Sequence, residues 1–214
     1  IYKYILNKIN IGYSKGYNLC INLCDTEYSL ILNADCSIEE DSIDNLLSAI
    51  ENYKNCFIAS PTSYNNVGEL NNVSGDLPEK KTFNKIINLE GDICVERVLG
   101  AAMLINTKEM INLGLFDENL FLFFSDYDLC RRAKNQGKSV IQVYKSKCFH
   151  MHGISKIKNF FKKIYIKEYY FTLDELKYFH KINLHHDLLK NLKNKAFMYF
   201  IKFIINLFIL NLKK

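Results

Sequence analysis

Four short apolar runs, each bounded by polar residues, constrain the fold of this 214-residue chain more than any other feature. They are YSLILN at 28–33, CFIASP at 56–61, GAAMLIN at 100–106 and SVIQVY at 139–144. Apolar runs of this length are typical of buried strands. One helix is predicted before the first run, over 15–24, and two between the runs, from 37 to about 53 and over 125–137. Alternating strands and helices predict an α/β fold with a mainly parallel sheet.

Several polar residues predict where the helices begin and end. Ser37 and Glu40 form the pattern of a capping box at the start of the second helix. Thr107 is predicted to cap a short helix after the third strand, and Gly137 to end the helix over 125–137. Residues 62–92 are polar with weak periodicity, which predicts a long loop.

The cysteines indicate a reducing compartment. Seven of them are scattered along the chain without a Cys-x-x-Cys pair. This pattern argues against a disulfide framework and against a zinc knuckle. The first ten residues, IYKYILNKIN, also lack the basic-then-apolar pattern of a secretion signal. We therefore expect a cytoplasmic protein.

Charge divides the chain into an acidic body and a basic tail. Residues 156–214 hold 13 Lys or Arg and 4 Asp or Glu, whereas residues 1–155 hold 15 and 19. The basic residues alternate with apolar runs, which favours a membrane surface over nucleic acid. Segment 196–212, interrupted by Lys202, is predicted to form a helix that lies in the membrane interface. The alternative is a helix packed on the body or on a partner subunit.

Polar side chains gather where the predicted strands end, and ligands of α/β sheets bind there. Asn33 and Asp35 follow the first strand, and their oxygens could bind a divalent cation. Both residue types also favour turns, so turn formation is the alternative. His150 follows the last strand and could complete a metal site, although an isolated histidine is more often an ordinary polar residue.

The stretch SDYDLCRR at 125–132 places two carboxylates in the first turn of a helix. Ser125 could cap this helix, and the helix dipole favours acidic residues there without any catalytic role. Asp126, facing a cleft, could instead take a proton from an acceptor hydroxyl. Asp128 is expected to brace the local geometry with Arg132, four residues further on.

Five blocks, read in order, carry a resemblance to a known family. They are NKINIGYSKGYN at 7–18, LNADC at 32–36, GAAMLI at 100–105, GLFDENLFLFFSDYDLCRR at 114–132 and HMHGIS at 150–155. Together they resemble the family 2 glycosyltransferases of GT-A fold, most of all the rhamnosyltransferase-like members that build bacterial surface polysaccharides. The resemblance implies a GT-A, Rossmann-like domain over residues 1–155, with helices on both faces of its sheet, followed by a helical tail over 156–214.

The resemblance also implies a role for individual residues. Asp126 would be the catalytic base, and Asp35 and His150 would hold a divalent metal, Mg²⁺ or Mn²⁺. The remaining residues would contact the donor (Asn10, Gly16, Asn18 and Asn33) or line the sugar and acceptor side (Gly100, Ala101, Asp117 and Glu118).

The implied reaction is an inverting transfer from a nucleotide-sugar donor, with rhamnose as one candidate sugar. The acceptor would be a lipid-linked or polysaccharide glycan, and the enzyme would lie on the inner face of the cytoplasmic membrane. Ala34 replaces the usual proline, and Ser125 replaces the usual glutamate before the base.

The first strands of the family, which hold the nucleotide base, do not precede Ile1. Residues 1–214 alone are therefore predicted to lack transfer activity. A non-catalytic remnant or binding partner that keeps the fold is the alternative.

Overall fold

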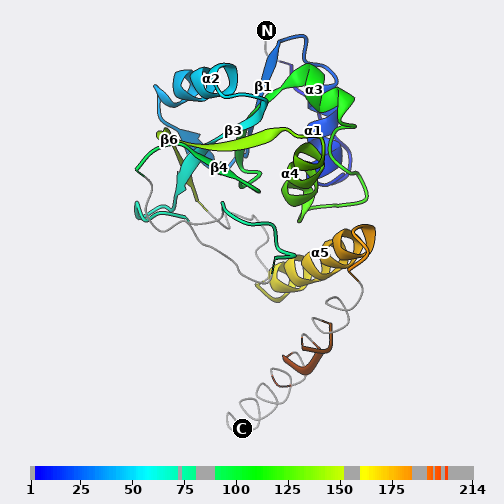
Figure 1. Cartoon of the computed structure of the whole chain (residues 1–214). Helices are drawn as coiled ribbons and strands as arrows, with labels where there is room; N and C mark the ends of the chain where they lie inside the picture. Colours follow the sequence, from blue (N-terminus) through cyan, green and yellow to red (C-terminus); the bar gives the residue numbers. More distant parts are fainter. Residues whose placement is uncertain are drawn as a thin grey trace.

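The computed structural model describes residues 3–71, 74–80, 90–151, 160–184, 192–194, 196–198 and 201. In these residues a six-stranded sheet is flanked by helices (Figure 1). The strands are β1 (Tyr28–Leu32), β2 (Cys36–Ile38), β3 (Cys56–Tyr64), β4 (Ile93–Val95), β5 (Ala102–Asn106) and β6 (Ser139–His150). The helices are α1 (Tyr13–Ile21), α2 (Ser42–Asn52), α3 (Thr107–Asn112), α4 (Ser125–Asn135) and α5 (Phe160–Lys181).

The long strand β6 organises the sheet, whose order is β1-β5-β3-β6-β2. β3 pairs with β6 along most of its length, β4 pairs with the first half of β6, and the last three residues of β6 pair with β2. In this register His150, at the end of β6, lies opposite Cys36. The end of β6 therefore meets the turn that follows β1.

Helices cover both faces of the sheet, as predicted. Buried residues of α2 pack on one face in a cluster with Cys56, Ala59, Leu104, Ile141 and Val143. Residues of α1, α3 and α4 pack on the other face in a cluster that includes Ile31, Phe57, Met103, Ile105 and Val140. Full burial of a Val, Ile, Met or Phe side chain stabilises a fold by about 1.5 to 3 kcal/mol. The α/β class is thus confirmed.

The strand directions correct the expectation of a mainly parallel sheet. Of the pairings between the described strands, only β3 with β6 is parallel. Parallel neighbours require a crossover of about a dozen or more residues. The chain between β3 and β6, which contains β4, β5, α3 and α4, is long enough for such a crossover, whereas β5 runs antiparallel to both of its neighbours, β1 and β3.

Three predicted helix caps are also wrong, because each of these residues has another position in the structure. Ser37 lies in β2 opposite Phe149, and the helix starts only at Ser42. The Thr107 hydroxyl lies 2.7 Å from that of Ser29, and the preceding residue caps α3 instead.

The third predicted cap is Ser125, at the start of α4. There the N-cap residue is Phe124, which has a left-handed φ of 63°. Ser125 is the first helical residue, and its Oγ lies 2.8 Å from the Oγ of Ser14. The predicted end of this helix is confirmed, with Gly137 at a φ of 70° just after it.

Helix α5 packs on the segment before α4. Tyr178 and Phe179 form a buried cluster with Leu120 and Phe124. Figure 1 shows α5 next to α4, on the side away from the sheet. The division of the chain at residue 155 stays a prediction.

The predicted membrane helix over 196–212 lies mostly outside the described residues. Among the helices that are described, none has the length and apolar character needed to cross a bilayer.

Candidate active site

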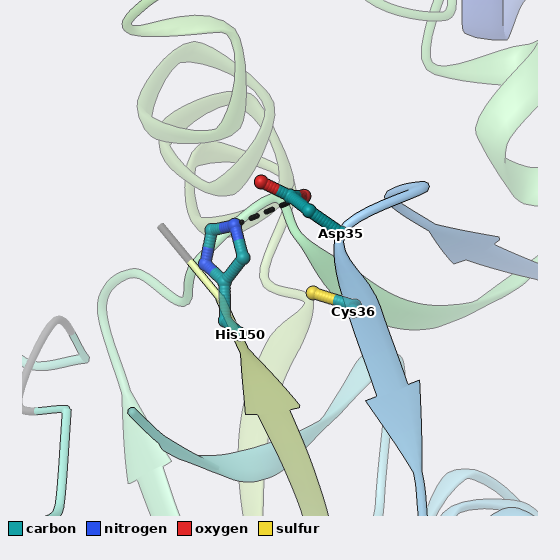
Figure 2. Close-up of side chains that lie close together, drawn as sticks. All are labelled: Asp35, Cys36 and His150. Carbon is teal, nitrogen blue, oxygen red and sulfur yellow. Dashed lines mark ion pairs between the residues drawn. The ribbon is translucent and has the colours of Figure 1, made fainter. Parts of the chain in front are cut away.

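The turn between β1 and β2 and the end of β6 form a cluster of three potential metal ligands. Ligand atoms of Asp35, Cys36 and His150 all lie within 4.8 Å of one another. His150 Nε2 is 3.3 Å from Asp35 Oδ1. Figure 2 shows the imidazole and the carboxylate directed toward each other, with the Cys36 sulfur beside them. The backbone also closes the cluster, because the Met151 N–H donates to the Asp35 carbonyl at 2.9 Å.

Two members of this cluster fit a divalent cation such as Mn²⁺. A carboxylate and a neutral imidazole are suitable ligands for it, whereas a thiol prefers softer metals. Burial raises the pKa of the Cys36 thiol to about 12, which keeps it protonated at neutral pH. Asp35 is only half-buried, so the remaining coordination positions can be filled from solvent or from a phosphate ligand.

Asp126 lies in the first turn of α4, and the backbone holds its carboxylate in place. Oδ2 accepts a hydrogen bond of 2.9 Å from the Gly100 N–H, and Oδ1 accepts one of 3.0 Å from the Tyr127 N–H. Burial raises the pKa of Asp126 above its ordinary value, although these N–H groups and the charge of Arg97 act to lower it. A carboxylate with a raised pKa is better matched to general-base catalysis near neutral pH.

Gly100 fits tightly between Asp126 and α1. The Tyr13 hydroxyl donates to the Gly100 carbonyl at 2.6 Å. A Cβ added at position 100 would lie 2.7 Å from that hydroxyl and 3.2 Å from the Cβ of Asp126. Contacts this short are sterically forbidden without movement of the neighbours, so this position requires glycine. Burial, followed by the nearby charge of Asp126, raises the pKa of Tyr13 well above its ordinary value.

The segment Gly100–Ala101 connects Asp126 to the ligand cluster. While Gly100 binds Asp126, the carbonyl of the buried Ala101 accepts from the Asn33 N–H at 2.8 Å. Asn33 begins the turn that carries Asp35, and its side chain accepts from the Tyr17 hydroxyl at 2.9 Å. The two groups predicted to do chemistry are therefore joined through one short piece of backbone.

The other residues predicted to bind the donor have structural contacts. Asn18 is buried, and its side chain bonds both the N–H and the carbonyl of Phe116 at 2.9 Å. Asn10 is exposed and accepts from the Gly12 N–H at 2.9 Å. A Cβ at Gly16 would meet no atom within 4 Å. Donor binding by these residues stays a prediction.

Asp117 and Glu118, predicted to line the sugar and acceptor side, border a cavity of about 420 Å³. Asn18, Arg132 and Lys181 also line it, whereas Asp126 does not. Burial acts to raise the pKa of Asp117, but hydrogen bonds from Lys181 and Asn119 lower it below the ordinary value. The role of Asp117 and Glu118 toward a sugar stays a prediction.

The brace predicted for Asp128 is confirmed. Arg132 Nε donates to Asp128 Oδ2 at 2.8 Å, and the carboxylate is almost fully buried. Lys181 of α5 adds a second cation, 2.6 Å from Asp128 Oδ1. Asp128 is therefore an internal ionic anchor, in contrast to Asp126, which has no ion pair among the described residues.

Comparison with known proteins agrees with this geometry. Residues 1–105 match the model of the family described as "Glycosyl transferase family 2". The match covers just under half of the chain and shows that this part is similar to the family. Over 167 residues the chain is 26% identical to the low-salt glycan biosynthesis hexosyltransferase Agl10 of Haloferax volcanii, a match covering 72% of the chain and 53% of that protein. The chain thus spans about half of the length of this relative.

Structural comparison supports a GT-A fold for this chain. The crystal structure of GalNAc-T7 with UDP, GalNAc and Mn²⁺ aligns with a TM-score of 0.55 at 12% sequence identity. The alignment covers 68% of the chain and 31% of GalNAc-T7. At this identity the likeness shows the fold alone.

Three residues of the candidate site were not predicted from the sequence. Cys36 joins the ligand cluster only through its pairing with His150, across more than a hundred residues. Tyr13 reaches Gly100 across a separation of 87 residues. Arg97 is buried, stacks 4.7 Å from the centre of the Tyr127 ring and donates to its hydroxyl. A buried arginine has no local sequence signal, because its burial depends on partners that are distant along the chain.

Proposed function

We propose that this protein is an inverting glycosyltransferase that moves a sugar from a nucleotide-sugar donor to a glycan acceptor. The observation that carries the proposal is the placement of Asp126, whose carboxylate is half-buried, has a raised pKa and is joined to the ligand cluster through Gly100 and Ala101. An acceptor hydroxyl at Asp126 would lose its proton to this carboxylate as its oxygen attacks the anomeric carbon.

Asp35 and His150 would hold a divalent metal, Mn²⁺ or Mg²⁺. A metal bound there supplies Lewis-acid stabilisation of the leaving diphosphate, worth several kcal/mol. GalNAc-T7, which shares the fold, was crystallised with UDP and Mn²⁺. His150 is 7% exposed, so its ring is already fixed by the protein before any ligand arrives.

The finer parts of the proposal concern the substrates. Agl10 is a hexosyltransferase of glycan biosynthesis, which supports a hexose donor and a glycan acceptor here. The sequence blocks that resemble rhamnosyltransferase-like members favour rhamnose and a surface polysaccharide. A lipid-linked acceptor would agree with the basic and apolar composition of residues 156–214.

A donor panel tests this function. The intact protein is incubated with Mn²⁺, a lipid-linked glycan fraction and each of several nucleotide sugars, and nucleoside diphosphate release is measured. We expect release that depends on the acceptor for one donor or a small group of donors. Acceptor-independent release with every donor would indicate donor hydrolysis and contradict transfer to a glycan. No release with any donor while the nucleotide still binds would favour a non-catalytic binding protein.

The C-terminal segment is proposed to bind the inner face of the cytoplasmic membrane. Lysines at 190, 193, 195, 213 and 214 flank an apolar stretch, and each basic residue near an anionic surface contributes about 1 kcal/mol of attraction. We expect sedimentation with anionic liposomes to fall sharply when residues 190–214 are removed. Neutral liposomes are the control, and equal sedimentation of the two forms would contradict the proposal.

A further inference from the structure

We propose that α5 is part of the catalytic apparatus, and that Asp174 is the residue that positions the loop carrying Asp126. This inference rests on the proposed function, because it takes Asp126 to be the base. The structural part of the inference is that the Asp174 side chain fixes residues 121–123. This part can be measured without any assay of sugar transfer.

One carboxylate from α5 satisfies three consecutive backbone groups. Asp174 Oδ1 accepts from the Phe121 N–H at 3.0 Å. Oδ2 accepts from the Leu122 N–H at 2.8 Å and from the Phe123 N–H at 3.0 Å. The Asp174 side chain is fully buried. Hydrogen bonds to an ionised acceptor are short and about twice as strong as neutral ones, so this contact fixes the loop backbone.

The fixed loop leads directly into the helix that carries the base. Phe124 follows it with a left-handed backbone, and Asp126 comes two residues later. A non-glycine residue with positive φ persists only where its surroundings hold it. Here the Phe124 ring is 6% exposed and lies 5.4 Å from the ring of Tyr178, also on α5. Thus α5 holds both the loop and the residue that turns it into α4.

The same loop touches the segment predicted to meet the donor. The Phe121 carbonyl accepts from the Tyr13 N–H at 2.7 Å. A Cβ at Gly12 would lie 2.5 Å from that carbonyl oxygen, so the two backbones are in close contact. Because Tyr13 in turn binds Gly100, a displacement of the loop would move Asp126 and its hydrogen-bond donor together.

A second ionic contact from α5 supports this arrangement. Lys181 Nζ lies 2.7 Å from Asp117 Oδ2 and 2.6 Å from Asp128 Oδ1. Asp128 is in the first turn of α4, two residues after the base. Two charged residues of α5 therefore contact the chain on either side of the N-terminus of α4. Asp174 binds the loop before the helix, and Lys181 binds Asp128 in its first turn.

The test uses Asp174→Asn, which keeps the shape of the side chain. Its amide nitrogen would face at least one N–H group, because both carboxylate oxygens now accept. Lys167→Gln is the matched control, since it also changes one charge on α5 and residue 167 is exposed. Hydrogen–deuterium exchange is then measured on peptides covering residues 120–127, together with the melting temperature of each variant.

We expect exchange at residues 121–123 to be at least about 10-fold faster in Asp174→Asn and unchanged in Lys167→Gln. We also expect kcat per folded molecule to fall by up to about 10²-fold with the donor KM unchanged, because a base displaced by about 1 Å loses its alignment. Unchanged exchange in a folded Asp174→Asn would overturn the positioning role. Faster exchange with an unchanged kcat in an active protein would overturn its link to catalysis.

These outcomes separate the inference from the proposed function. If the wild-type protein transfers no sugar while exchange responds to Asp174→Asn, the loop contact stands and the function is wrong. If Asp174→Asn does not fold, Asp174→Glu gives the second measurement, since it keeps the charge and lengthens the side chain by one carbon. A uniform rise in exchange over the whole chain in that variant would show a purely structural role.

Discussion

Asp126→Asn should lower kcat by about 10² to 10⁴-fold, the usual contribution of a general base. The amide has almost the same shape as the carboxylate, and its oxygen can still accept from the Gly100 N–H. It cannot accept a proton from the acceptor hydroxyl. Binding of the donor, measured by calorimetry with a nucleoside diphosphate, should therefore remain close to the wild-type value.

Asp128→Asn is the matched control, in the same turn of α4. This carboxylate is buried and paired with Arg132 and Lys181, so removing its charge leaves two cations without their partner. Breaking a buried ion pair in this way costs about 3 to 5 kcal/mol of stability. We expect a clearly lower melting temperature for Asp128→Asn. The decrease should be smaller for Asp126→Asn, whose amide nitrogen would face only the Tyr127 N–H. Wild-type turnover in Asp126→Asn would show that the Asp126 carboxylate only stabilises the start of α4 and is not the base.

A second large effect is expected for Asp35→Ala, which should remove most of the divalent metal binding. Asp35 supplies the one carboxylate in the cluster of Asp35, Cys36 and His150. Losing a direct ligand is expected to weaken Mn²⁺ binding by more than the roughly 10 to 100-fold that follows loss of an outer partner. Calorimetric titration of Mn²⁺ in the presence of a nucleoside diphosphate measures this.

Two control variants test whether the loss of Mn²⁺ binding is specific to Asp35. Glu40→Ala removes an exposed carboxylate a few residues away and should leave Mn²⁺ affinity unchanged. Cys36→Ser should also bind Mn²⁺ normally, because a protonated thiol contributes little to a hard cation. Equal affinity in Asp35→Ala and Glu40→Ala would show that Asp35 is a turn residue and that the metal, if any, binds elsewhere.

The strands were predictable from the sequence, and their directions were not. The apolar runs at 28–33, 56–61, 100–106 and 139–144 each became a strand, because continuous apolar runs of that length are buried on both faces. The same pattern is expected whichever way a neighbour runs. The antiparallel insertion of β5 between β1 and β3 depends on its pairing partners, which no local window contains.

The part of the site that lies at the ends of strands was predictable from the sequence. Asp35 and His150 were expected near each other and lie 3.3 Å apart, since β2 brings its own start to the end of β6. The contribution of α5 was not predicted. The basic composition of residues 156–214 indicated a surface helix, whereas Asp174 is a buried acid in that segment, and its three hydrogen bonds join residues more than fifty positions apart.

The central claim, that Asp126 is the base, is tested most directly by the pH dependence of kcat at saturating donor and acceptor. Burial raises the pKa of Asp126, and only its ionised form can accept a proton, so activity should be lost as the pH falls through that raised value. We predict a single acidic limb with a midpoint above about 3.9, the pKa of an ordinary aspartate. A kcat that stays constant down to about pH 4 in a protein that remains folded would contradict the account.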